Sequence, residues 1–358
     1  MAARSASVSD SPPTAAARQE AMRRWLQQLG YEPLRLTPAS ADASFRSYWR
    51  LEVEGEPSRI VMDAPPEKEP LQPFVAIAKS WRGIGLNLPQ VLAEERGQGF
   101  LLLSDLGCCH YLQQLRRGEE GYEPVQLYRA AIEALVLLQQ QQAPQTPPLP
   151  AYDRQLLLSE MELFTTYFLA QQLQLELTAT EEDLLNQTFA LLTENALEQP
   201  QVAVHRDYHS RNLMVTEPLP GVLDFQDAVI GPLSYDLVSL LRDCYIAWPE
   251  EWVTARIEEY LALATEAGVV PSDCSRQQFR RWFDRMGLQR HLKAIGIFSR
   301  LNIRDGKPGY LGDIPRTFGY LVAVSGSDAA LQPFHTFLLQ RVAPLLDKQQ
   351  LQPQEGRG

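Results

Sequence analysis

Residues His205–Asn212 read HRDYHSRN. This stretch combines an aspartate, Asp207, that can accept or orient a hydroxyl proton with an asparagine, Asn212, whose neutral oxygen suits a metal ion. Apolar residues flank it on both sides, VAV at 202–204 and LMV at 213–215. We therefore predict a catalytic loop that connects two short strands.

A second acidic residue, Asp224, follows twelve residues after Asn212, at the end of the apolar run GVL at 221–223. The intervening PLPG at 218–221 is a turn sequence, so we predict a hairpin that brings Asn212 and Asp224 together. A carboxylate there would hold Mg²⁺ against phosphate groups. The alternative, that Asp207 and Asp224 merely cap turns, explains neither Asn212 nor the order of the three residues.

The segment 231–237, GPLSYDL, begins the next predicted helix, which continues through Leu241. Ser234 or Asp236 could cap that helix. Asp236 could also brace the catalytic loop by accepting hydrogen bonds from its backbone or from Arg206.

The pattern of apolar residues changes along the chain. Residues 48–53, 59–62 and 100–103 read as strands, and one helix is expected near 74–84. After Asp105 the spacing is helical. Helices are expected around 127–138, 155–172, 180–196, 234–247, 250–267, 276–304 and 328–346.

Composition narrows the class of protein. The 358 residues carry 33 basic and 44 acidic side chains, a net charge of −11, which argues against a nucleic-acid partner. The four cysteines, at 108, 109, 244 and 274, show no metal-ligand spacing and fit a reducing compartment. With no apolar run long enough to span a membrane and no signal-peptide pattern, we expect a cytoplasmic protein without a membrane partner.

Longer stretches carry a family resemblance. HRDYHSRNLMV at 205–215 and LDFQDAVIGPLSYDLVSLLRD at 223–243 resemble the aminoglycoside phosphotransferase family, which is related in fold to protein kinases. Residues 60–66, 99–107 and 290–307 support the resemblance, which extends from about residue 20 to 345.

The resemblance implies an α+β, bilobed protein-kinase-like fold with a small antiparallel-sheet lobe and a mainly helical lobe. We expect a disordered segment at 1–18, a nucleotide-binding lobe at 19–103, a catalytic and acceptor-binding lobe at 104–348 and a disordered tail at 349–358. The composition of the two ends, rich in Ala, Ser and Pro or in Gln, Gly and Arg, agrees with this division.

The resemblance also implies an ATP-dependent kinase that uses Mg²⁺, with Asp207, Asn212 and Asp224 as catalytic residues and the last two as metal ligands. Its nearest subgroup phosphorylates the anomeric C1 hydroxyl of N-acetylmuramate and N-acetylglucosamine in peptidoglycan recycling. A monomer is expected, and the choice between ATP and GTP stays open.

On the nucleotide side, the segment 40–46 takes the place of a phosphate-covering loop, although it lacks glycine. Arg59–Asp63 offers no lysine for the phosphates, so Arg46 is the first candidate for that cation and Arg59 the second. Either Glu67 or Glu69 could supply its carboxylate partner. The predicted nucleotide-binding residues are Ser44, Phe45 and Arg46 from the loop and Leu102, Leu103 and Ser104 from the connection between the lobes.

On the acceptor side, Lys293, Arg300 and Arg304 share one helical face. This basic face favours an anionic or neutral acceptor over a polycationic antibiotic, unless it is simply a solvated surface. His291 reads as a core histidine. The predicted acceptor-binding residues are His209, Arg211, Asp227, Arg300 and Arg304.

Two alternatives remain at this point. The same chemistry could act on another hydroxyl acceptor: an aminoglycoside, a choline-like alcohol or homoserine. The absent strand lysine also leaves room for a nucleotide-binding pseudokinase that acts as a scaffold, although Asp207, Asn212 and Asp224 are all present.

Overall fold

A computed structural model describes residues 14–32, 35–41, 45–118, 121–140 and 148–349. The chain divides into two compact units: Met1–Val75 with Pro89–Asp105, and Ala76–Leu88 with Leu106–Gly358. Each unit is described by itself below. Within the described residues, none of the helices combines the length and apolar character needed to cross a membrane.

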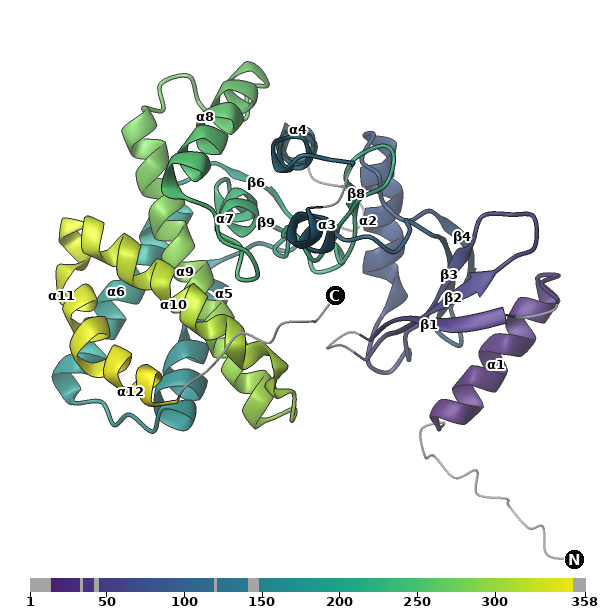
Figure 1. The fold of residues 1–358 in the computed structure, drawn as a ribbon, viewed down its shortest axis with the longest axis horizontal. Coiled ribbons are helices and arrows are strands. Elements are labelled where there is room, and N and C mark those ends of the chain that lie inside the picture. The colour runs from purple at the N-terminus through teal and green to yellow at the C-terminus, as the bar shows by residue number, and fades with distance from the viewer. Residues whose placement is uncertain (1–13, 33–34, 42–44, 119–120, 141–147, 350–358) are drawn as a thin grey trace, which may run out of the picture. The chain divides into compact units, whose positions relative to one another are not determined.

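The first unit is built on an antiparallel sheet with strand order β1-β2-β3-β5-β4. Helix α1 (Ala15–Gln28) lies along this sheet (Figure 1), where its Met22, Trp25 and Leu26 join a buried cluster with Val61 and Phe100. The strands are β1 (Arg35–Ala41), β2 (Ser47–Glu52), β3 (Arg59–Asp63), β4 (Val91–Glu95) and β5 (Phe100–Ser104). The expected small antiparallel sheet is thereby confirmed.

The start of α1 differs from the composition-based expectation that the chain packs only after residue 18. The helix begins at Ala15, and the Thr14 side chain accepts a hydrogen bond from Ala17 N at 3.3 Å. Arg18 then forms an ion pair with Asp63 of β3 and donates to the Gln98 carbonyl at 2.7 Å. An alanine-rich segment looks featureless in composition, yet it has high helix propensity and gains a partner for its arginine.

The second unit is mainly helical, as predicted. Its longest helix, α9 (Arg276–Ile303), contacts α5, α6, α7 and α10, and most of its residues are buried. The helix α2 (Leu71–Gly83) ends in this unit. The others are α3 (Tyr111–Arg117), α4 (Pro124–Gln140), α5 (Arg154–Leu163), α6 (Ala179–Leu197), α7 (Tyr235–Leu241), α8 (Glu250–Glu266), α10 (Ile314–Ser327), α11 (Gln332–Phe337) and α12 (Ala343–Lys348).

Several helix boundaries differ from the sequence prediction. The predicted helix 155–172 is α-helical only to Leu163 and continues as a π-helix, η1 (Phe164–Gln172). At this junction Gly296 of α9 meets the backbone so closely that an added Cβ would lie 2.4 Å from the Leu163 carbonyl carbon. The glycine therefore permits a helix contact that the apolar pattern could not reveal.

Other differences have local causes. The predicted helix 234–247 stops at Leu241, after which Asp243 Oδ1 accepts from Tyr245 N at 2.9 Å and turns the chain. The predicted helix 328–346 is divided into short pieces, with Pro333 and Pro344 at the starts of two of them. Helices α3 and α10 were not predicted at all.

Candidate active site

The backbone of the HRDYHSRN loop is fixed by a buried carboxylate. Asp236 Oδ2 accepts from His205 N at 2.6 Å, and Oδ1 accepts from Arg206 N at 3.0 Å. These bonds hold Arg206 in the left-handed region, at φ 77°. The predicted role of Asp236 in bracing the loop backbone is confirmed, whereas Ser234 does not cap the helix and donates its hydroxyl to Gln199 Oε1 at 2.8 Å.

Asp236 reaches the loop from the first turn of α7. Strand β6 (Gln201–Val204) leads into the loop and pairs with β9 (Val229–Pro232), and helix α7 begins three residues after β9 ends. The end of β9 lies opposite the start of β6, whereas Asp236 accepts its hydrogen bonds beyond the other end of β6, where the loop begins. Asp236 is completely buried there, so its two backbone hydrogen bonds form without competition from water.

His205 is held in one tautomer by its neighbours. Its Nε2 lies 2.8 Å from the Leu223 carbonyl and donates to it, while Nδ1 accepts from Asp207 N at 3.3 Å. Both roles are filled by the neutral ring. Burial lowers the pKa of His205 to about 4, against an opposing effect of the Asp207 charge.

The Asp207 residue is half-buried. Its carboxylate accepts no hydrogen bond from any residue in the described part of the chain. Burial by itself raises the pKa of Asp207, but electrostatic interactions, first with Lys293 and then with His209 and Arg290, outweigh burial and bring the pKa to about 2. Asp207 is thus an ionised hydrogen-bond acceptor at neutral pH.

The predicted hairpin after the loop is present. Strands β7 (Leu213–Met214) and β8 (Gly221–Val222) pair, and they place Asn212 Nδ2 3.4 Å from Asp224 Oδ2 and 3.0 Å from the Asp207 carbonyl. Asp224 has a left-handed backbone, φ 61°, a strained conformation for a non-glycine residue. The structure therefore brings Asp207, Asn212 and Asp224 together.

The oxygen atoms of this group fit a magnesium ion. Both Asn212 and Asp224 offer hard oxygen donors, the type that Mg²⁺ prefers. Asn212 Oδ1 accepts no hydrogen bond within the described residues, and Gln226 Nε2 donates to Asp224 Oδ1 at 2.7 Å. A cluster of three His, Cys, Asp or Glu side chains able to hold a metal by themselves is absent from the described residues.

A buried ion network lies behind the loop. Glu160 of α5 pairs with Arg206 at 2.5 Å and with Lys293 of α9 at 3.1 Å, and it also accepts a hydrogen bond from the Tyr152 hydroxyl. Lys293 donates to the Tyr235 hydroxyl at 3.1 Å. The expectation that Lys293 belongs to an open basic face is wrong, because its side chain is only 9% exposed and is paired. The sequence prediction missed Glu160; its one signal was an acidic residue on the apolar face of α5.

The other predicted basic residues do not join the loop by any contact in the described structure. Arg304 is exposed and pairs with the adjacent Asp305 at 2.7 Å. Arg300 is half-buried, and its Nε has no hydrogen-bond partner among the described residues. His291 is a core histidine as expected: it is fully buried, stacks on Tyr320 and lies 2.8 Å from the Arg242 carbonyl through Nε2.

Three predicted acceptor residues lie in or near the loop. His209 is buried beside the Tyr245 ring, with centroids 5.3 Å apart, and Arg211 is half-buried against the same ring. Asp227 is exposed, and its Oδ2 accepts from Gln226 Nε2 at 3.3 Å. Their roles toward an acceptor stay predictions.

The predicted nucleotide-binding residues belong to the first unit, apart from Ser44, which lies outside the described residues. Arg46 pairs with Glu69 at 2.7 Å, so Glu69 supplies the carboxylate partner that the sequence left undecided between Glu67 and Glu69. The Phe45 ring is 64% exposed and lies 4.2 Å from Lys68 Nζ. Arg59 pairs instead with Glu56. Leu102 and Leu103 are buried in β5, and Ser104 Oγ accepts from Gln90 N at 2.8 Å.

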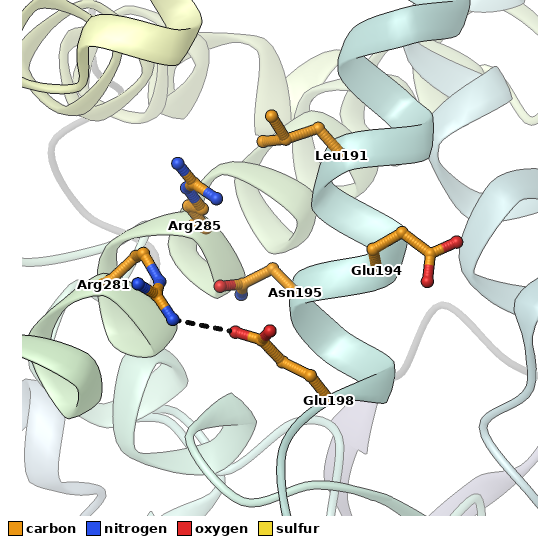
Figure 2. Close-up of a pocket in the computed structure, with 6 residues that line it drawn as sticks. All are labelled: Leu191, Glu194, Asn195, Glu198, Arg281 and Arg285. Atoms are coloured by element: carbon orange, nitrogen blue, oxygen red, sulfur yellow. Dashed lines mark hydrogen bonds and ion pairs between the residues drawn. The ribbon is translucent and has the colours of Figure 1, made fainter. Parts of the chain in front are cut away.

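A separate pocket of about 380 Å³ lies between α6 and α9 and is lined by Leu191, Glu194, Asn195, Glu198, Arg281 and Arg285 (Figure 2). Its charged side chains already have partners. Glu198 pairs with Arg281 at 3.4 Å, Arg285 with Asp328 at 2.7 Å, and Glu194 with Arg154 at 2.6 Å. The pocket therefore presents satisfied ion pairs and none of the loop residues.

The family model described as "Phosphotransferase enzyme family" matches residues 35–269, which include the first-unit sheet, the loop and the hairpin. The chain belongs to the phosphotransferase enzyme family. The chain is accordingly a phosphotransferase.

Two relatives in the family carry the same name, N-acetylmuramate/N-acetylglucosamine kinase. The protein from Pseudomonas aeruginosa is 47% identical over 289 residues, 81% of this chain and 83% of its own length. The one from Neisseria meningitidis serogroup B is 44% identical over 328 residues, 91% of this chain and 96% of its own. Among solved structures, a choline/ethanolamine kinase family protein from Mesorhizobium loti superposes with a TM-score of 0.60 at 12% identity, over 89% of this chain and 97% of that one. The phosphotransferase fold predicted from the sequence is thereby confirmed.

The ion network predicts a stability effect. Glu160→Gln removes the carboxylate shared by Arg206 and Lys293 and leaves two buried cations without it. We expect the free energy of unfolding, measured in urea, to fall by about 3–5 kcal/mol. The control is Glu194→Gln, which breaks the exposed pair with Arg154 and should cost less than about 1 kcal/mol. Equal, small losses in both variants would show that the network does not hold the loop.

The buried histidines predict a pH dependence. Burial lowers the pKa of His205 to about 4 and that of His291 to about 3, below the ordinary 6.5. Between the lowered and the ordinary pKa, each of these two histidines binds more protons in the unfolded chain than in the folded one. Their contribution to stability is therefore complete above pH 6.5 and falls as the pH decreases toward 4. Burial raises the pKa of Asp236 to about 7, which acts in the opposite direction, so the effect of His205 is measured against a variant that lacks it.

Urea unfolding at pH about 7.5 and about 5 measures this effect, at about 1.4 kcal/mol for each unit of pKa difference. His205→Gln should lose less stability than the wild type between the higher and the lower pH. The same dependence of stability on pH in the wild type and in His205→Gln would contradict neutral burial of His205.

Proposed function

We propose that this phosphotransferase transfers the γ-phosphoryl group of ATP to the anomeric C1 hydroxyl of N-acetylmuramate and N-acetylglucosamine, a reaction of peptidoglycan recycling. The observation that carries the proposal is the convergence of Asp207, Asn212 and Asp224 on one loop and hairpin. The names of the two relatives supply the acceptor, since both are N-acetylmuramate/N-acetylglucosamine kinases.

Asp207 is proposed to hold the acceptor hydroxyl in line with the phosphate. Its carboxylate is ionised, because its pKa is about 2, and it accepts no hydrogen bond from a described residue. So weak a base suits a reaction that depends mainly on positioning, and an anomeric hydroxyl is more acidic than an ordinary alcohol. Phosphoryl transfer requires little covalent help from the protein beyond this.

Mg²⁺ bound to ATP would be held by Asn212 and Asp224, and it would neutralise charge on the transferred phosphate. The chain's own contribution is to fix these two oxygens. Leu223 N donates to the Asn212 carbonyl at 2.9 Å, and Gln226 donates to Asp224 Oδ1, so both ligands are oriented before any ion arrives.

The first unit is proposed to bind the nucleotide. Phe45, Arg46, Leu102, Leu103 and Ser104 are the residues assigned to it. The Arg46–Glu69 pair would supply the cation that β3 lacks, since β3 carries Asp63 where a lysine was sought and Asp63 is paired with Arg18. A cytoplasmic monomer, with ATP and an amino sugar as its small-molecule partners, is part of the same proposal.

Phosphorus NMR of the product tests the proposal. With N-acetylmuramate and Mg-ATP, we expect a product whose phosphorus couples to the anomeric proton, because the hydroxyl at C1 is the one presented to Asp207. A phosphate coupled to the C6 protons would show the acceptor position to be wrong. Absence of product with both sugars would contradict the proposed substrates.

Asp207→Asn tests the catalytic assignment. The change keeps the size of the side chain but removes its charge, and we expect kcat to fall by about 10²–10⁴-fold. Asp183→Asn, on the exposed face of α6, is the control and should keep the wild-type kcat. Undiminished turnover by Asp207→Asn would remove Asp207 from the mechanism.

A further inference from the structure

Arg211 lies in an aromatic setting within the loop. Its guanidinium carbon is 4.8 Å from the centroid of the Tyr245 ring and 5.7 Å from that of Tyr310. Tyr245 follows α7, and Tyr310 belongs to the 3-10 helix η2 (Pro308–Asp313). Two segments that are far apart in the sequence thus hold one cation. Cation–π contacts with the two tyrosine rings stabilise the Arg211 guanidinium.

The two rings are themselves fixed. Tyr310 stacks on Phe298 of α9 with centroids 5.7 Å apart and planes at 15°, and Tyr245 lies 6.3 Å from the same Phe298 ring. The backbone of Tyr245 is also held, since its N–H donates to Asp243 at 2.9 Å and its carbonyl accepts from Arg116 at 3.3 Å. The surroundings of Arg211 are therefore rigid. The Arg211 side chain is already restricted before a ligand binds, which reduces the conformational entropy that it loses on binding.

The side chain of Arg211 has no carboxylate partner among the described residues. Within the described residues it forms no ion pair, whereas Arg206, Arg242 and Arg285 each do. The nearby carboxylate, Asp313, bonds Arg316 at 3.1 Å. Burial raises the pKa of Asp313 even though the charges of Arg316, Arg211 and Arg116 oppose it. Three guanidinium groups around one carboxylate leave an excess of positive charge.

This excess lies next to the reacting groups. Arg211 directly precedes Asn212, and His209, which precedes it by two residues, packs against the same Tyr245 ring. A planar guanidinium in a fixed place is suited to bind a carboxylate through two parallel hydrogen bonds. The two proposed sugars differ in one relevant way: N-acetylmuramate carries a lactyl carboxylate on C3, and N-acetylglucosamine carries a hydroxyl there.

We propose that Arg211, seated between Tyr245 and Tyr310, binds the lactyl carboxylate of N-acetylmuramate and so sets the preference between the two sugars. This inference rests on the proposed function, because it assumes that an amino sugar is the acceptor. In this role Arg211 contacts the carboxylate that only N-acetylmuramate carries. Contacts that both sugars share would not affect the preference between them. A phosphate-binding role would instead affect both sugars alike.

The test compares kcat/KM for the two sugars in Arg211→Gln and Arg211→Lys. Loss of a charge-assisted pair worth about 1.5–3 kcal/mol should lower the ratio of kcat/KM for N-acetylmuramate to that for N-acetylglucosamine by about 10–100-fold in Arg211→Gln. Arg211→Lys keeps the charge without the fork and should recover part of the ratio. Arg129→Gln, which changes an exposed arginine of α4, should leave the ratio at the wild-type value.

An equal fall for both sugars in Arg211→Gln would overturn the inference. The affinity for N-acetylmuramate, measured by calorimetry without nucleotide, tests the role of Arg211 independently of the proposed reaction. Weaker binding by Arg211→Gln than by the wild type supports the carboxylate site even if the phosphate is found at a position other than C1. Equal binding by both proteins contradicts the site even if the C1 phosphate is formed.

Discussion

The geometry of the site depends on one buried carboxylate, that of Asp236, which accepts hydrogen bonds from the backbone of His205 and Arg206. Leaving a buried carboxylate without its hydrogen bonds costs free energy. The two hydrogen bonds to Asp236 therefore restrict the loop to a narrow set of conformations. They also hold Arg206 in a left-handed conformation that an arginine rarely adopts. Asp207 directly follows Arg206 in the chain, and its carbonyl accepts a hydrogen bond from the Asn212 side chain.

The charges around this loop are arranged in two groups. Behind it, Lys293 and Arg206 share Glu160, and together with Arg290 and His209 the lysine keeps Asp207 ionised. The other group consists of Arg211, Arg116 and Arg316 around Asp313, and within the part of the chain that the structure describes its positive charges outnumber the negative one. Arg211 lies there among aromatic rings. The first group maintains the site, and the second is the one that we propose to bind a ligand. The same residue type thus has a different role according to whether a carboxylate partner is present.

The parts of this structure that sequence predicted well are those formed by neighbours in the chain. The HRDYHSRN loop, its hairpin and the approach of Asn212 to Asp224 depend on contacts within about twenty residues, and a turn sequence marks the hairpin. Asp236 was also predicted because it follows the hairpin closely. The sheet and the helical second unit followed from apolar periodicity.

The parts that could not be predicted depend on distant contacts. Lys293 looked like a surface residue, because its partner Glu160 lies on another helix, and no local pattern links the two. The close contact between Gly296 and the end of α5 could not be read from the apolar pattern. The aromatic surroundings of Arg211 are formed by Tyr245 and Tyr310, which come from separate segments. Arg300 and Arg304 shared a helical face with Lys293, but a shared face does not place residues in the site.

The proposed roles of Asp207, Asn212 and Asp224 can be tested by a crystal structure of the chain with Mg²⁺, a non-hydrolysable ATP analogue and N-acetylglucosamine. We expect one Mg²⁺ ion bound by Asn212 Oδ1 and an Asp224 carboxylate oxygen, with the Asp207 carboxylate within hydrogen-bond distance of the C1 hydroxyl. A metal ion bound away from Asn212 and Asp224, or a sugar hydroxyl that does not reach Asp207, would contradict these roles.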